Sequence, residues 1–186
     1  MSKLIKYAVC IVFIFAVLSA CTSLTASKNK VYLSSNIQLN INSVPAQMFN
    51  KSWQQVLYIT SQQNTHTVFA QLAINDKGAI KLLLMTVQGF PIMELEKPLN
   101  GPVKTRNMLA VEGIDSHYIL ADIALVHWPV AFLQKQLEGA LIEQVGSNRE
   151  VFNDEGTFIT IDYSDESTTL NNILHQYQIT FKKVEQ

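Results

Sequence analysis

Apolar and polar positions alternate along most of the chain, and one segment near the middle breaks this pattern. A period of two is that of a half-buried strand. In residues 115–137 the spacing becomes helical, and apolar side chains cover nearly the whole circumference, interrupted by Asp122 and His127. A helix that is apolar on almost all sides must be sandwiched or must cover a cavity, because a surface helix keeps a polar face.

The alternating stretches predict nine or ten strands around this helical segment. Turn residues such as Asn75-Asp76-Lys77-Gly78 and Asn100-Gly101 link the early strands closely, which indicates an antiparallel meander. So many strands are expected to curl and hide their edges. The expected fold is mainly β with a helical insertion, a half-open antiparallel barrel lidded by a helix pair at about 116–137. The predicted strands are 37–41, 53–60, 67–74, 79–87, 90–96, 103–111, 140–145, 149–152, 157–163 and 172–184.

The helical segment is expected to be two helices that meet at Trp128-Pro129. Asp115 or Ser116 is a suitable cap for the first helix, and Pro129 either begins a second helix or kinks a continuous one. Two interpretations of the pair stay open. It plugs one mouth of the barrel with Trp128 as a core residue, or it is a lid over an apolar cavity.

The beginning of the chain has the plan of a secretory signal peptide. Lys3 and Lys6 form a positive start, and residues 7–18 form an apolar core closed by small residues. Leu18-Ser19-Ala20-Cys21 resembles a bacterial lipobox, in which cleavage precedes a cysteine that then carries a diacylglycerol. The alternative is an uncleaved anchor with an ordinary Cys21 thiol, although spanning a bilayer takes about 20 apolar residues.

This leader divides the chain into three expected parts. They are a lipoprotein-type signal peptide at 1–20, a lipidated N-terminus with a flexible tether at 21–35, and a single domain at 36–186. Acyl chains on Cys21, at about 0.8 kcal/mol per buried methylene, hold a protein to a membrane. An aspartate directly after the cysteine resembles a signal for inner-membrane retention. Because Thr22 follows here, the expected location is the outer membrane, facing the periplasm.

Composition and motifs exclude several classes of function. Once Lys3 and Lys6 are removed, the mature chain has fewer basic than acidic side chains and no basic stripe, so nucleic acid is not an expected partner. The sequence has no nucleophile elbow, H-E-x-x-H, C-x-x-C, phosphate loop or dinucleotide fingerprint. We therefore expect no enzyme activity, no cofactor and no metal site. The four histidines, which lack metal-ligand spacing, are His66, His117, His127 and His175.

Asp122 is the one acidic residue inside the apolar helix. A buried carboxylate needs a partner, and Arg149 on the next hairpin is the candidate for a structural ion pair. The alternative is a capping or solvent-facing aspartate.

Leu120-Ala121-Asp122, Trp128-Pro129 and the later Arg149 resemble a family of bacterial outer-membrane lipoproteins. That family often accompanies aryl-polyene and related lipid synthesis clusters and is similar to the LolA/LolB carriers of lipoprotein localisation. The resemblance covers roughly residues 36–184. The chain departs from the family with Ala124 where a glutamine is usual and His127 where a tyrosine is usual, so no shared role is carried over to these two positions.

The resemblance implies a concave, apolar barrel interior that accepts acyl chains of lipids or lipoproteins and passes them to the outer membrane without bond chemistry. The implied partners are the membrane, through acylated Cys21, acyl chains, and a soluble periplasmic carrier. For each residue proposed to line this cavity, the alternative is that it packs in the hydrophobic core. The candidates for the acyl-chain cavity are Trp53, Tyr58, Phe69, Leu82, Leu84, Met85, Phe90, Met93, Trp128 and Phe132.

Two rival functions remain. One is a periplasmic assembly or scaffold lipoprotein whose barrel is filled by side chains and whose partners dock on the outside. The other is an esterase or acyltransferase, which requires a Ser-His-Asp cluster in the folded chain. An empty apolar groove distinguishes a carrier from a scaffold.

Overall fold

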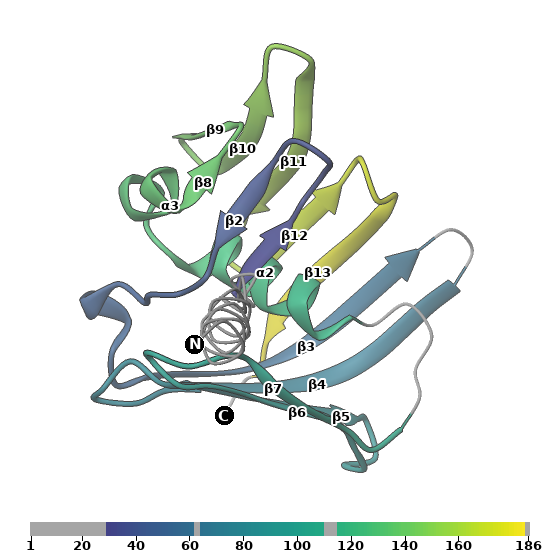
Figure 1. Cartoon of the computed structure of the whole chain (residues 1–186). Coiled ribbons are helices and arrows are strands. Elements are labelled where there is room, and N and C mark those ends of the chain that lie inside the picture. Colours follow the sequence, from purple (N-terminus) through teal and green to yellow (C-terminus); the bar gives the residue numbers. More distant parts are fainter. Residues whose placement is uncertain (1–28, 62–63, 110–114, 185–186) are drawn as a thin grey trace, which may run out of the picture.

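The structure is a computed structural model, and it describes residues 29–61, 64–109 and 115–184. These residues form a ten-stranded antiparallel sheet, a three-stranded sheet and two α-helices (Figure 1). Within them, no helix is long and apolar enough to cross a bilayer. The predicted signal peptide and Cys21 lie outside the described residues.

Two antiparallel meanders make up the large sheet. Its last strand in the chain, β13 (Tyr177–Lys183), pairs with its first, β3 (Lys51–Ser61), so that Tyr177 lies opposite Ser61 and Ile179 opposite Ile59. This pairing joins the two meanders into one sheet, with order β7-β6-β5-β4-β3-β13-β12-β11-β10-β9. The first meander comprises β3 (Lys51–Ser61), β4 (Asn64–Ile74), β5 (Ile80–Thr86), β6 (Pro91–Lys97) and β7 (Lys104–Asn107). The second comprises β9 (Leu141–Val145), β10 (Asn148–Asn153), β11 (Gly156–Tyr163), β12 (Ser167–Asn172) and β13 (Tyr177–Lys183).

The large sheet bends but does not close into a barrel. Its outer strands, β7 and β9, are both edges. In Figure 1 the first meander lies at the bottom and the second rises above it, with α2 between them. The four residues of β7, Lys-Thr-Arg-Asn, are all exposed, and a short charged edge resists pairing with other chains. The predicted mainly-β, half-open fold with a helical insertion is confirmed.

Two helices fill the concave side, α2 (Ser116–His127) and α3 (Val130–Gln136). The side chain of Asp115 accepts a hydrogen bond from the backbone N–H of His117 at 2.7 Å and so caps α2. All eight residues from 119 to 126 are buried, as expected for a sandwiched helix. The prediction of two helices meeting at Trp128-Pro129 is confirmed.

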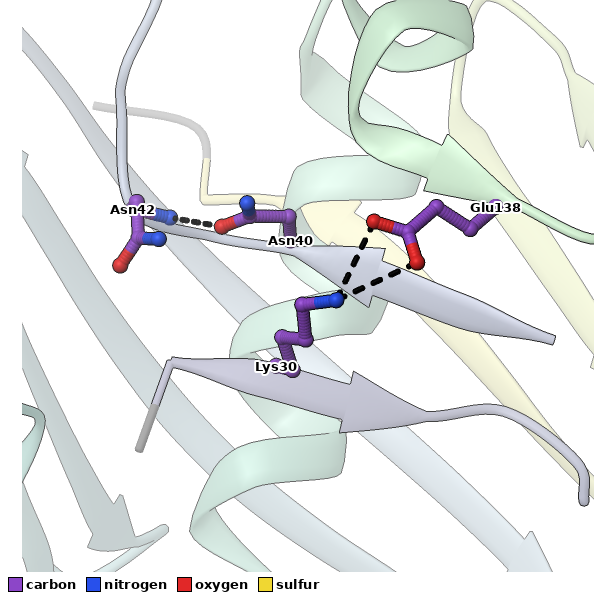
Figure 2. Close-up of polar contacts among 4 residues, drawn as sticks. All are labelled: Lys30, Asn40, Asn42 and Glu138. Atoms are coloured by element: carbon purple, nitrogen blue, oxygen red, sulfur yellow. Dashed lines mark hydrogen bonds and ion pairs between the residues drawn. The ribbon is translucent and has the colours of Figure 1, made fainter. Parts of the chain in front are cut away.

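A small sheet covers α2 from the other side. It consists of β1 (Lys30–Tyr32), β2 (Gln38–Asn40) and β8 (Leu137–Glu138). The ammonium of Lys30 pairs with the carboxylate of Glu138 at 3.2 Å across this sheet (Figure 2). In the same view Asn40 Oδ1 accepts a hydrogen bond from the backbone N–H of Asn42 at 3.0 Å.

The tether predicted to extend to residue 35 is wrong at its C-terminal end. Val31 and Leu33 are buried against the core, so the domain includes residues from 30 onward. Val31-Tyr32-Leu33 is an apolar run of only three residues between polar stretches, which is too short to indicate a strand.

The strand predicted at 172–184 is also wrong. This range contains the last residue of β12, a turn at 173–176 and then β13. Apolar alternation continues across this turn, which has no Gly or Pro, and Gln176 takes the left-handed conformation with φ 52°. The period of two therefore could not mark the break.

Candidate functional site

A cavity of about 370 Å³ lies between α2 and the junction of β3 with β13. We name it the α2–β13 cavity. Three isoleucines form its apolar wall, and six polar residues complete it. Its volume lies in the range of small-molecule sites, about 300–1,000 Å³. The lining residues are Ile59, Ile119 and Ile179, with Ser61, Asp115, Tyr118, Asp122, His175 and Tyr177.

The periods of the helix and the strands bring these residues together. Tyr118 and Ile119 lie three and four positions after Asp115, the N-cap of α2, and four and three positions before Asp122, so these residues share one face of the helix. In β3 and β13, positions two apart point to the same side of the sheet, so Ile59 and Ser61 face the cavity together with Tyr177 and Ile179. The pairing of β13 with β3 thus creates the floor of the cavity.

Asp122 is the buried polar centre of the cavity, with 1% of its surface exposed. The hydroxyl of Tyr177 donates a hydrogen bond shared by the two carboxylate oxygens, at 2.9 and 2.8 Å. The side-chain amide of Asn172 donates to the same hydroxyl at 3.1 Å. Burial raises the pKa of Asp122 to about 7, although the hydrogen bond from Tyr177 acts in the opposite direction. Burial, together with the neighbouring Asp122, raises the pKa of Tyr177, which therefore stays a donor.

His175 and Tyr118 hold the β1 segment beside the cavity. Nε2 of His175 lies 3.0 Å from the carbonyl oxygen of Leu33, and because a carbonyl only accepts, this nitrogen carries the proton. The hydroxyl of Tyr118 donates to the carbonyl oxygen of Tyr32 at 3.1 Å. The two rings meet edge to face with centroids 5.0 Å apart. Tyr118 and His175 therefore connect α2 and the β12–β13 turn to the small sheet.

The predicted ion pair between Asp122 and Arg149 is wrong. The guanidinium of Arg149 instead donates to the carbonyl oxygens of Leu125, Val126 and Trp128 and to Oε1 of Gln144. The C-terminal end of a helix leaves carbonyls without partners and carries partial negative charge, which attracts a cation. Asp122 lies one turn earlier and points towards β13.

None of the ten predicted wall residues lines the α2–β13 cavity. Leu82, Leu84, Met93 and Trp128 are packed in the core, at 0–2% exposure. Tyr58 and Phe69 occupy the alternate positions of their strands, opposite the buried residues on β3 and β4, and so face away from the core. The Tyr58 ring lies under the ammonium of Lys182 instead, at 5.8 Å.

The remaining four candidates are scattered. Met85 follows a bulge in β5, and Phe90 is 65% exposed in the β5–β6 turn. Phe132 borders an open depression beside Pro129. Trp53 lines a second pocket, of about 250 Å³, together with His127.

His127 is a half-buried member of this second pocket, which is also lined by the charged residues Asp165, Glu166 and Lys183. Its ring lies 4.9 Å from that of Trp53, and its Nε2 lies 3.3 Å from Oε1 of Gln55. Burial, with a contribution from the charge of Arg149, lowers the pKa of His127 to about 4. The imidazole is therefore neutral near pH 7. Among the described residues, no three His, Cys, Asp or Glu side chains are grouped to hold a metal ion.

Sequence reasoning missed the true neighbours of Asp122. In the predicted strand 172–184, alternation puts His175, Tyr177 and Ile179 on one face, and in the structure these three residues line the cavity that contains Asp122. The missing step was the pairing of β13 with β3, which joins residues far apart in the chain.

Comparison with known proteins gives one family match. Residues 52–185 match the family described as "Protein of unknown function (DUF3261)". The matched segment includes every residue that lines the α2–β13 cavity but leaves out β1 and β2. No curated protein matches the chain.

Proposed function

Since the chain belongs to the DUF3261 family of proteins of unknown function, we infer its activity from the site and propose that it binds one acyl chain of a lipid or lipoprotein in the α2–β13 cavity. The observation that carries the proposal is a cavity of about 370 Å³ whose apolar wall is Ile59, Ile119 and Ile179. Each methylene moved from water into such a wall contributes about 0.8 kcal/mol. No bond chemistry is required.

In its full form the proposal is a carrier anchored at the outer membrane. The lipobox ending at Cys21 and the resemblance to the LolA/LolB carriers support it. A soluble periplasmic carrier delivers the acylated cargo, and α2 acts as the lid of the cavity. Cargo then moves on to the outer membrane, because a bilayer buries an acyl chain more completely than a small cavity does.

A scaffold lipoprotein is the second candidate. It is favoured by the packing of the concave interior, where Leu84, Met93 and Trp128 are fully buried side chains rather than the walls of an open groove. In this case partners dock on the outer surface, and the α2–β13 cavity holds no cargo.

Titration of the delipidated mature protein with a fluorescent fatty acid separates the two candidates. The carrier proposal expects saturable binding of one acyl chain per protein. Ile179→Phe places extra volume at the cavity wall and should weaken binding at least about tenfold. Ile173→Phe makes the same change at an exposed turn position and should leave binding unchanged. A folded wild-type protein that binds no fatty acid would refute the carrier and favour the scaffold.

A further inference from the structure

We propose that the α2–β13 cavity selects amphiphiles whose polar end is a protonated amine, which pairs with the carboxylate of Asp122. The inference rests on the proposed function for the apolar part of the ligand and adds the chemistry of its polar end. It assigns to Asp122 the recognition of the ligand.

Asp122 is a buried acidic group without a cation of its own. Among the described residues it forms no ion pair, and its hydrogen-bond donor is the hydroxyl of Tyr177. Arg149, which the sequence predicted as its ion-pair partner, donates to carbonyls at the C-terminal end of α2 instead. A buried carboxylate without a counter-charge is unfavourable, and a ligand that brings an ammonium group removes this cost.

The other polar groups of the cavity also favour a donor-rich ligand. The hydroxyl of Tyr118 and Nε2–H of His175 already donate to carbonyls of the β1 segment, and the hydroxyl of Tyr177 donates to Asp122. β3 adds Ile59 and Ser61, neither of them charged. The acidic groups in the lining are therefore Asp115 and Asp122. An ammonium offers three N–H donors to such a lining, whereas a carboxylate head group is repelled by both aspartates.

The ionisation of Asp122 makes this selectivity dependent on pH. Its pKa is about 7, so the carboxylate is largely charged at pH 8 and largely neutral at pH 5.5. An alkylamine stays protonated over this range. The titratable groups that share the cavity with Asp122 are Asp115 and Tyr118 of α2, together with His175 and Tyr177 before and at the start of β13. Preference for an amine over an alcohol should therefore rise with pH.

The test compares three ligands with the same chain, octylammonium, octanol and octanoate, by calorimetric titration of the delipidated mature protein at pH 8. Octylammonium should bind about tenfold more tightly than octanol, as a charge-assisted hydrogen bond predicts, and octanoate more weakly than either. Asp122→Asn keeps the shape of the side chain and should bring the ratio of amine to alcohol affinity close to one. Asp162→Asn, at an exposed position of β11, should leave the ratio unchanged.

Each outcome decides a different part of the proposal. Equal binding of octylammonium and octanol by the wild type would refute the head-group inference and leave the proposed function standing. Failure of all three ligands to bind would refute both. Should Asp122→Asn not fold, the wild type alone decides, because its ratio of amine to alcohol affinity should fall severalfold from pH 8 to pH 5.5. A constant ratio would contradict the role of Asp122.

Discussion

The hydroxyl of Tyr177 lies 2.9 and 2.8 Å from the two carboxylate oxygens of Asp122, a residue 55 positions earlier in the chain. This contact connects the start of β13 to the middle of α2, and it lies in the wall of the α2–β13 cavity. It places a carboxylate among isoleucine side chains with a neutral hydroxyl as its partner. The consequences for stability and for binding both follow from that environment.

The first prediction concerns the pH dependence of stability. The pKa of Asp122 rises from 3.8 in the unfolded chain to about 7 in the folded protein. At pH values between these two pKa values, the folded state therefore binds a proton that the unfolded state has released. Stability is therefore lost as pH rises from about 4 through 7. Relative to Asp122→Asn, the wild type should lose on the order of 2 kcal/mol of unfolding free energy between pH 5 and 8, measured by urea denaturation.

Tyr177→Phe provides a second measurement at the same place. It removes the hydrogen bond that lowers the pKa of Asp122, so the loss of stability should extend to higher pH. Parallel pH profiles for the wild type and Asp122→Asn would show that Asp122 is not the group responsible.

Arg149 should contribute strongly to stability through α2. Its guanidinium is buried and donates to the carbonyls of Val126 and Trp128 and to Gln144. Arg149→Met removes the donor from the carbonyl of Trp128 and from Gln144, whereas the carbonyl of Val126 keeps its hydrogen bond from the hydroxyl of Tyr163. The change should lower the unfolding free energy by about 2–4 kcal/mol. Arg106→Met, on the exposed edge strand β7, should change it by less than about 0.5 kcal/mol. Equal effects of the two changes in thermal unfolding would contradict the helix-capping role.

Gly139 should tolerate no side chain. Its φ is +83°, and a Cβ atom there would clash with the carbonyl oxygen of Asn36. Gly146 also has a positive φ, +60°, but no atom lies within 4 Å of its Cβ position. Gly146→Ala should therefore cost about 1 kcal/mol for the backbone conformation alone. Gly139→Ala should cost at least about 2 kcal/mol more, and similar melting temperatures for the two variants would rule out the close contact.

The resemblance of residues 18–21 to a lipobox predicts a modification that labelling can detect. Cells grown with radioactive palmitate should label the wild-type protein but not Cys21→Ala, because Cys21 is the predicted acylation site. Cys10→Ala, in the apolar core of the leader, serves as the matched control and should keep the label. Persistent labelling of Cys21→Ala would refute the lipoprotein assignment.

The sequence predicted the parts of this fold that depend on local periodicity. The early strands, the Asp115 cap and the helix pair around Pro129 follow from alternation, capping chemistry and helical spacing, which are all encoded within a few residues. β1 was missed because it is only three residues long, with Val31 as its one buried residue, and follows a polar stretch. The β12–β13 turn was missed because alternation continued through it.

The site depends on contacts that no local pattern encodes. Asp122 was correctly identified as a polar residue that needs a partner, yet its partner Tyr177 becomes adjacent only when β13 pairs with β3. Arg149 appeared to be the partner because a carboxylate attracts a cation, but the carbonyls at the end of α2 are closer to it. Apolar composition alone also selected core residues such as Leu84 and Trp128 as cavity walls, since composition does not distinguish a filled interior from an empty one.

The central claim is that an acyl chain occupies the α2–β13 cavity, and a crystal structure with a terminally brominated octanol tests it most directly. The anomalous scattering of bromine locates the end of the bound alkyl chain independently of the electron density of the protein. The account predicts one bromine peak per molecule beside Ile59 and Ile179, and no such peak in crystals of Ile179→Phe. A peak on the outer face of the sheet, or an empty cavity in wild-type crystals saturated with the alcohol, would contradict it.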